Sequence, residues 1–191
     1  MVFSTITFLF YFLPIVLVIY YIVPKKWKNT ILLIASLLFY FYGEPKYIVL
    51  MILSIIMTYI FGILIEKNKN TQKAKMYLII SICISVGLLI YFKYTNFIIK
   101  NIQIWLTNKI EFIHIILPIG ISFYTFQMIS YLIDVYNGKA KVQKNILKLA
   151  TYVSLFPQLI AGPIVRYTTI EEQLEYKLKP TNINAMKITL K

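Results

Sequence analysis

The chain has 191 residues, of which 59% are apolar and 14% are charged, and its mean hydropathy is +0.73. A soluble domain of this size does not normally have such a composition, which indicates an integral membrane protein. The net charge of +13 does not indicate nucleic-acid binding, because the lysines form short clusters between apolar segments. With Cys83 as its single cysteine, the chain has no intrachain disulfide.

Six apolar segments are predicted to cross or enter the membrane. The first, residues 6–23, is long enough at about 1.5 Å per residue to cross a hydrocarbon core of about 30 Å. No positive charge precedes it and no small-residue cleavage site follows it, so we expect a retained span rather than a signal peptide. The other segments are residues 30–42, 47–65, 76–92, 113–133 and 146–165.

The lysines between these segments predict the orientation. Residues 24–28, 66–75 and 139–144 carry most of the positive charge of the connections. Since such connections stay in the cytoplasm, these three are predicted to face the cytoplasm, and the N-terminus to lie outside. We therefore expect a multi-pass protein of the plasma membrane whose single membrane domain covers residues 1–191.

The connection after residue 92 does not fit this alternation, because it also carries lysines but is expected outside. Its apolar residues share one helical face, which predicts a separate amphipathic helix lying in the membrane interface. A surface-exposed loop helix is the alternative. The face contains Tyr94, Phe97, Ile98, Ile102 and Trp105. Residues 168–191 are predicted to form a polar tail with a short amphipathic helix that ends before Pro180.

The sequence contains none of the familiar nucleotide-binding, metal-binding or nucleophile motifs, and we expect no metal site. Its single histidine, His114, begins an apolar segment. We interpret it as a packed or interfacial side chain, with a catalytic base as the alternative.

Residues 117–138, LPIGISFYTFQMISYLIDVYNG, combine helix-breaking and polar residues in an apolar segment. Pro118 and Gly120 are predicted to break or bend the helix near its start. An unpaired polar group in hydrocarbon costs roughly 2–7 kcal/mol, so the polar side chains are expected to face partners or a wet cavity. These side chains are Ser122, Tyr124, Gln127, Tyr131 and Asp134.

Residues 154–166, SLFPQLIAGPIVR, predict a second interruption at membrane depth. Pro157 and Pro163 lack a backbone donor, Gly162 permits close approach, and Gln158 needs hydrogen-bond partners. Because irregular backbone at this depth must be buried in protein or line a wet cavity, we expect a re-entrant or broken helix that lines a site. A packed proline kink without a cavity is the alternative. Arg166, the single arginine, is interpreted as either a ligand or structural residue or an interfacial anchor.

These stretches resemble the membrane-bound O-acyltransferase family, and most closely its bacterial branch of alginate O-acetyltransferases and D-alanyl transfer proteins. The resemblance lies in LPIGISFYTFQ at 117–127, YLIDVYNG at 131–138 and FPQLIAGPIVRY at 156–167, and extends to the N-terminal segments. It implies an all-α polytopic membrane protein whose helices surround a tunnel. In such a tunnel an acyl group, which the alginate branch implies to be acetyl, would pass from a cytoplasmic donor to a hydroxyl of an exported polysaccharide.

The resemblance also implies roles for particular residues and partners. Tyr124, Gln127, Gln158 and Arg166 would shape and polarise the tunnel from this part of the fold. The donor would be acetyl-CoA or an acyl carrier, and membrane lipid, a polysaccharide acceptor and an extracytoplasmic acyl-transfer protein would be partners. Family members are roughly twice as long, and their histidine general base lies in a later segment, so no catalytic residue is assigned here.

The shorter length leaves three alternatives open. A C-terminal half or a downstream polypeptide would complete the enzyme, or the chain would be an inactive truncated relic. A non-enzymatic polytopic membrane protein, such as a transport or assembly subunit, is the alternative from another functional class.

Overall fold

The computed structural model describes residues 6–24, 27–105, 115–161 and 165–174. All regular secondary structure in these residues is helical, which confirms the predicted all-α class. A π-helical turn, η1 (Phe8–Phe12), leads directly into α1 (Leu13–Ile22). The helices that follow are α2 (Lys28–Gly43), α3 (Ile48–Lys67), α4 (Gln72–Trp105), α5 (Ile121–Tyr136), α6 (Ile146–Ser154), α7 (Phe156–Ala161) and α8 (Tyr167–Leu174).

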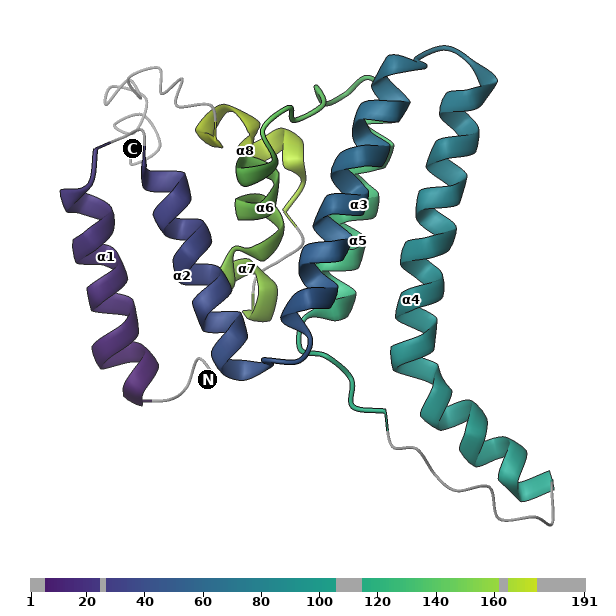
Figure 1. Cartoon of the computed structure of the whole chain (residues 1–191), viewed down its shortest axis with the longest axis horizontal. Helices are drawn as coiled ribbons and strands as arrows, with labels where there is room; N and C mark the ends of the chain where they lie inside the picture. The colour runs from purple at the N-terminus through teal and green to yellow at the C-terminus, as the bar shows by residue number, and fades with distance from the viewer. Residues whose placement is uncertain (1–5, 25–26, 106–114, 162–164, 175–191) are drawn as a thin grey trace, which may run out of the picture.

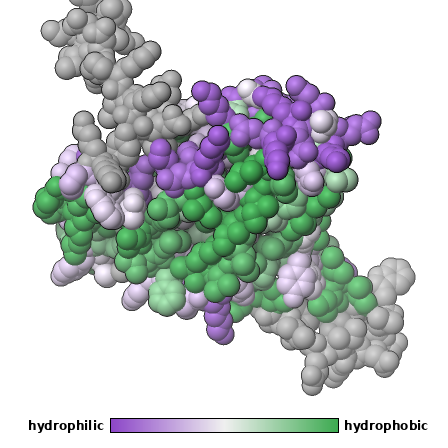
Figure 2. All heavy atoms as spheres, turned by 45° about the horizontal axis from the view of Figure 1, so that its top comes forward, coloured by the Kyte–Doolittle hydropathy of each residue, from purple (hydrophilic) through white to green (hydrophobic). Residues whose placement is uncertain are grey.

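Two of the described helices, α3 and α4, are long and apolar enough to cross a membrane, and the apolar helices Phe8–Ile22 and Lys28–Gly43 are shorter. Many large apolar side chains point outward from these helices, for example Leu53 and Ile60 on α3. Figure 2 shows these side chains as a hydrophobic belt with hydrophilic residues gathered along one edge. A belt of this kind is the surface expected of a membrane protein.

The three lysine-bearing connections lie at the same end of the helix bundle. The α1–α2, α3–α4 and α5–α6 connections are all at the top of Figure 1, and the α2–α3 turn is at the bottom. We call the top the lysine-rich end; its described lysines include Lys28, Lys67, Lys69, Lys73, Lys139, Lys141 and Lys144. The grouping of these connections agrees with the alternation predicted from the sequence.

Helix α4 differs from the prediction. One helix of 34 residues replaces the expected span at 76–92 and the separate amphipathic helix after it. At 1.5 Å per residue it is about 51 Å long, longer than a hydrocarbon core of about 30 Å. The prediction of a separate helix was wrong because no proline or glycine follows Phe92 to end α4. The apolar residues Tyr94, Phe97, Ile98 and Ile102 are exposed on this extension, and its location in an interface stays a prediction.

Helix α5 begins later than the predicted span at 113–133. Residues 115–118 are not helical, Gly120 has a left-handed φ of 76°, and the helix starts at Ile121 and runs to Tyr136. The predicted break at Pro118 and Gly120 is therefore confirmed, but the apolar residues before it do not extend the helix.

The predicted segment 146–165 is divided into two short helices, α6 and α7, with Leu155 in a non-helical conformation between them. Helix α6 begins at the lysine-rich end, α7 lies deeper in the bundle, and α8 lies at the lysine-rich end again (Figure 1). The described parts of this segment thus enter and return at the same end. We call residues 146–167 the re-entrant segment.

The core that holds this segment lies between α2, α3, α5 and α6. Its fully buried side chains include Met51 of α3, Tyr124 and Met128 of α5, and Leu149 of α6. A second cluster joins the rings of Phe8, Phe12, Phe39 and Phe156, with centroids 5.4–6.0 Å apart, and it fixes the start of α7 against η1 and α2.

Candidate functional site

The break between α6 and α7 follows from Pro157. In a continuous helix, residue 157 would donate its backbone N–H to the carbonyl of Val153, but proline has no such donor and its ring collides with that carbonyl. The chain turns at Leu155, with φ −54° and ψ 110°, and α7 starts with Pro157 in its first turn, where no donor is needed. The amides of Gln158 and Leu159 then donate to the Leu155 carbonyl at 3.0 and 3.1 Å.

Side chains from two neighbouring helices replace the backbone hydrogen bonds lost at the break. The Phe156 amide donates to Ser36 Oγ of α2 at 3.3 Å. Gln127 Nε2 of α5 donates to the Tyr152 carbonyl at 3.2 Å. Both bonds are buried, so the Phe156 amide and the Tyr152 carbonyl are satisfied by protein side chains rather than by lipid or bulk water.

The two polar motifs meet in a direct amide pair. Gln127 Nε2 also donates to Gln158 Oε1 at 3.1 Å, which links α5 to α7. Gln127 is only 4% exposed, whereas Gln158 is half-buried. The pair uses the oxygen of Gln158, so the amide nitrogen of Gln158 keeps two N–H donors for another group. We call Gln127 and Gln158 the glutamine pair.

Gly120 lets the two motifs pack closely at a second point. A Cβ on Gly120 would lie 2.9 Å from Leu159 Cγ and 3.1 Å from the Leu159 carbonyl oxygen. The positive φ of this residue also favours glycine. The start of α5 therefore rests on the backbone of α7.

Three tyrosines hold the returning part of the re-entrant segment at the lysine-rich end. The ring of Tyr167 packs edge-to-face on Tyr131 and Tyr152, at 4.9 and 5.2 Å between centroids. Tyr152 Oη donates to the Val165 carbonyl at 2.9 Å. Gln143 contacts two of these tyrosines. Its backbone N–H donates to Tyr131 Oη at 2.9 Å, and its side-chain Nε2 donates to Tyr167 Oη at 2.8 Å.

Comparison with known proteins identifies relatives over nearly the whole chain. It is 38% identical over 182 residues to a probable alginate O-acetylase AlgI of Pseudomonas aeruginosa, a match that covers 93% of this chain and 35% of that protein. A protein of the same name from Pseudomonas syringae is 38% identical over 178 residues, covering 91% of this chain and 34% of the relative. A peptidoglycan O-acetyltransferase of Helicobacter pylori is 33% identical over 206 residues, covering 93% and 39%.

The chain is similar to these O-acetyltransferases over nearly its whole length. The resemblance expected from the motifs is thereby confirmed. No family model and no solved structure matches the chain. The chain spans about a third of the length of these relatives, so the expected half was too large a share.

Tyr124 and Arg166, the other two residues expected to shape a tunnel, are placed differently from the glutamine pair. Tyr124 is fully buried, and its hydroxyl has no hydrogen-bond partner among the described residues. The side chain of Arg166 is exposed, and its carbonyl accepts from the Thr169 amide at 3.1 Å. The roles of Tyr124 and Arg166 in a tunnel stay predictions. Gly162, Pro163 and His114 lie outside the described residues.

Three cavities lined by described residues lie away from the glutamine pair. One of about 320 Å³ lies between α1 and α2, one of about 540 Å³ between the α2–α3 turn, α4 and residues 115–116, and one of about 480 Å³ beside the start of α4. None of these three is lined by Gln127 or Gln158. The predicted tunnel beside these residues stays a prediction.

Three side chains that complete the site were not predicted from the sequence, namely Ser36, Gln143 and Tyr152. Ser36 is fully buried in an otherwise apolar stretch of α2, and a hydroxyl in such a stretch is the signal that would have marked it. Gln143 lies in a connection at the lysine-rich end, where a polar residue is unremarkable by sequence alone.

Proposed function

We propose that the chain forms part of a membrane-bound O-acyltransferase that transfers an acyl group, most simply acetyl, to hydroxyls of an exported polysaccharide. The observation that carries this proposal is the 33–38% identity, over 91–93% of the chain, to proteins named alginate O-acetylase and peptidoglycan O-acetyltransferase. Both names describe acetyl transfer to oxygen atoms of bacterial glycans. Because the chain spans about a third of the length of those proteins, we propose that it supplies one part of such an enzyme.

In the membrane arrangement that we propose, the lysine-rich end faces the cytoplasm and the N-terminus lies outside. The positive charge of the three connections at that end supports this orientation. The first five apolar segments cross the bilayer, and the re-entrant segment dips into it from the cytoplasmic side. The protein is then a multi-pass protein of the plasma membrane.

The re-entrant segment and the glutamine pair form one wall of the proposed acyl-transfer tunnel. Half-buried Gln158 offers two N–H donors that its bond with Gln127 does not use. Donors fixed by a buried partner are suited to polarising an acyl carbonyl, since they need no reorganisation during reaction. The neighbouring lysine-rich end would attract an anionic donor such as acetyl-CoA or an acyl carrier.

The rest of the reaction needs groups that we do not assign to this chain. The acceptor hydroxyl must lose a proton as it attacks the acyl carbonyl, and a histidine general base in another segment of the family fold would take it. A polysaccharide acceptor, membrane lipid and an extracytoplasmic acyl-transfer protein remain the proposed partners.

A segment exchange tests the proposal. In the Pseudomonas aeruginosa relative, the matching residues are replaced by this chain, and the acetyl content of secreted alginate is measured in a strain that lacks the native gene. We expect acetylation to be restored by the exchange and to fall sharply with Gln158→Leu, because the donors at the tunnel wall are lost. The unexchanged relative is the positive control, and an epitope tag measures the amount in the membrane.

The result that contradicts the proposal is an exchanged protein that accumulates normally but leaves alginate unacetylated. That outcome would favour a non-enzymatic membrane role for this part of the chain. Acetylation that is restored equally by the wild-type segment and by Gln158→Leu would remove Gln158 from the tunnel wall and leave the function intact.

A further inference from the structure

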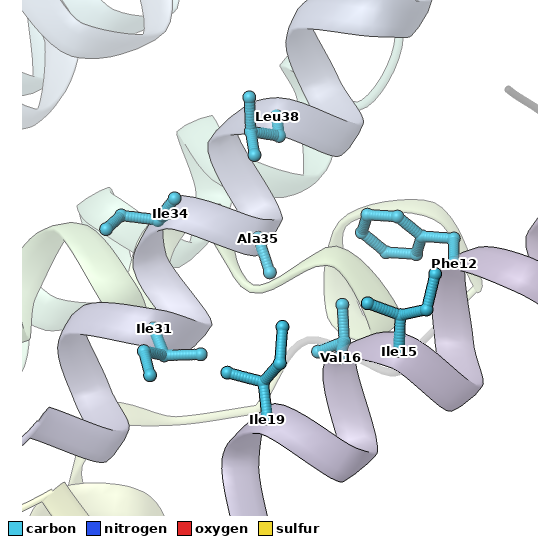
Figure 3. Close-up of a pocket in the computed structure, with 8 residues that line it drawn as sticks. All are labelled: Phe12, Ile15, Val16, Ile19, Ile31, Ile34, Ala35 and Leu38. Atoms are coloured by element: carbon cyan, nitrogen blue, oxygen red, sulfur yellow. The ribbon is translucent and has the colours of Figure 1, made fainter. Parts of the chain in front are cut away.

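A groove with apolar side chains lies between α1 and α2, beside residues 12–19 and 31–38. It has a volume of about 320 Å³, and Figure 3 shows its side chains facing one another from the two helices. The groove lies on the outer side of the bundle, away from the glutamine pair, and the O-acyltransferase function proposed above does not use it. The side chains that line the groove include Ile15 and Ile19 of α1 and Ile31 and Ile34 of α2.

The groove opens towards the surroundings of the bundle. Ile15 and Ile19 are 55% and 42% exposed, and Ile34 is 52% exposed, although all three line it. A cavity of this chemistry offers water no hydrogen-bond partners, so water does not fill it favourably. At the depth of the hydrophobic belt, the available apolar occupant is a lipid acyl chain.

The ammonium group of Lys28 lies at the upper end of the groove. Lys28 lies one helical turn before Ile31, and its Nζ is 4.6 Å from the centroid of the Tyr20 ring and 5.8 Å from that of Tyr21. This position is at the lysine-rich end, where lipid headgroups would lie above the belt. Trp27, beside Lys28, is exposed at the same level, as aromatic residues at membrane interfaces commonly are.

We propose that the groove between α1 and α2 binds an anionic phospholipid. One acyl chain lies between the helices, against Ile19, Ile31 and Ile34, and the phosphate lies beside the ammonium of Lys28. An anionic lipid is expected because the side chains of the groove are neutral and apolar, whereas Lys28 at its headgroup end is a cation held over two aromatic rings. The attraction between one lysine near the membrane surface and anionic lipid corresponds to about a five-fold preference for anionic over neutral lipid.

Trp27 is the reporter for the test. The full chain with Trp105→Phe, which leaves Trp27 as the single tryptophan, is placed in phosphatidylcholine nanodiscs that contain a small fraction of brominated phosphatidylglycerol or brominated phosphatidylcholine. Bromine quenches tryptophan fluorescence at short range, so the two quenching curves report the relative occupancy of sites beside Trp27. We expect the anionic lipid to quench at lower fractions, by roughly five-fold.

Matched variants separate the two parts of the site. Lys28→Gln is expected to remove most of the preference and Lys28→Arg to retain it. Ile34→Phe fills the groove and is expected to weaken quenching by the anionic lipid, whereas Val18→Phe, at an exposed position of α1 outside the groove, is not. Far-ultraviolet circular dichroism of each variant shows whether the helices are intact, and only intact variants are compared.

Several outcomes would overturn the proposal. Equal quenching by the two lipids shows that no anionic lipid is selected. A preference that Lys28→Gln removes but Ile34→Phe leaves unchanged shows headgroup attraction without a bound chain in the groove. Weak quenching by both lipids, together with a dimer detected by cross-linking, shows that a second copy of the chain covers the groove instead.

Discussion

Replacing Gln127 with leucine tests how the re-entrant segment is held. The substitution keeps the side chain large but removes both hydrogen bonds from Gln127 Nε2, one to Gln158 Oε1 at 3.1 Å and one to the Tyr152 carbonyl at 3.2 Å. Tyr152 is 1% exposed, so its carbonyl would lose its partner in a buried position. A buried acceptor left without a partner costs about 1–3 kcal/mol, and we expect Gln127→Leu to lower the free energy of unfolding by that amount.

The hydrogen bond between Gln127 and Gln158 is expected to contribute less to the free energy of unfolding than the bond to the Tyr152 carbonyl. A double-mutant cycle measures this contribution. Gln158 is half-buried, so water can hydrate its oxygen after Gln127 is replaced, and Gln158→Leu alone is expected to cost about 1 kcal/mol or less. Coupling energies of hydrogen-bonded side chains in membrane proteins average about 0.6 kcal/mol and reach about 1.7 kcal/mol. We therefore expect a coupling energy of about 0.6 kcal/mol between Gln127→Leu and Gln158→Leu.

The free energies are measured by titrating the chain in mild detergent micelles with sodium dodecyl sulfate and following helicity. Gln72→Leu is the matched control, because Gln72 is exposed at the start of α4 and its replacement should change stability by less than about 0.5 kcal/mol. If the effects of Gln127→Leu and Gln158→Leu are additive, the side chains do not interact and the link between α5 and α7 is refuted.

Two further substitutions probe the same junction. Gly120→Ala places a Cβ 2.9 Å from the Leu159 side chain of α7 at a residue with a left-handed φ, so it should lower the free energy of unfolding by more than about 2 kcal/mol. A Cβ at Gly87 would meet no atom within 4 Å, so the control Gly87→Ala should be neutral or stabilising by up to about 1 kcal/mol. Equal effects of the two variants in thermal unfolding would contradict the close packing at Gly120. Ser36→Ala removes the acceptor of the Phe156 amide and should cost about 1–3 kcal/mol. The Ser81 hydroxyl donates to the Leu78 carbonyl of its own helix, so Ser81→Ala should cost much less. No difference between the two serine variants would show that the break does not depend on Ser36.

Local chemistry made the helix breaks predictable from the sequence. Pro118, Gly120 and Pro157 each change the backbone at their own position, so their effect does not depend on distant residues. The lysine clusters likewise predicted which connections lie together. The continuation of α4 through residues 93–105 was not predictable from hydropathy, because a change from apolar to mixed composition does not end a helix when no breaking residue is present.

The contacts that build the site depend on residues far apart in the chain. Gln127 and Gln158 were each predicted to need a partner, but their pairing across 31 residues is set by how α5 packs against α7. Ser36 lies 120 residues before the amide that it accepts from. Such partners are brought together by tertiary packing, which local sequence patterns do not reveal. The sequence patterns therefore predicted the need for a partner without its identity.

The sidedness of cysteine labelling tests whether the re-entrant segment enters and leaves the membrane at the lysine-rich end. In a Cys83→Ser background, the exposed residues Lys141 before α6 and Thr169 in α8 are each replaced with cysteine, and Lys46→Cys marks the opposite end. Intact cells are treated with a membrane-impermeant maleimide. We predict that Lys46→Cys reacts, whereas Lys141→Cys and Thr169→Cys react only after the membrane is opened. If Thr169→Cys reacts from outside together with Lys46→Cys, the segment crosses the membrane and is not re-entrant.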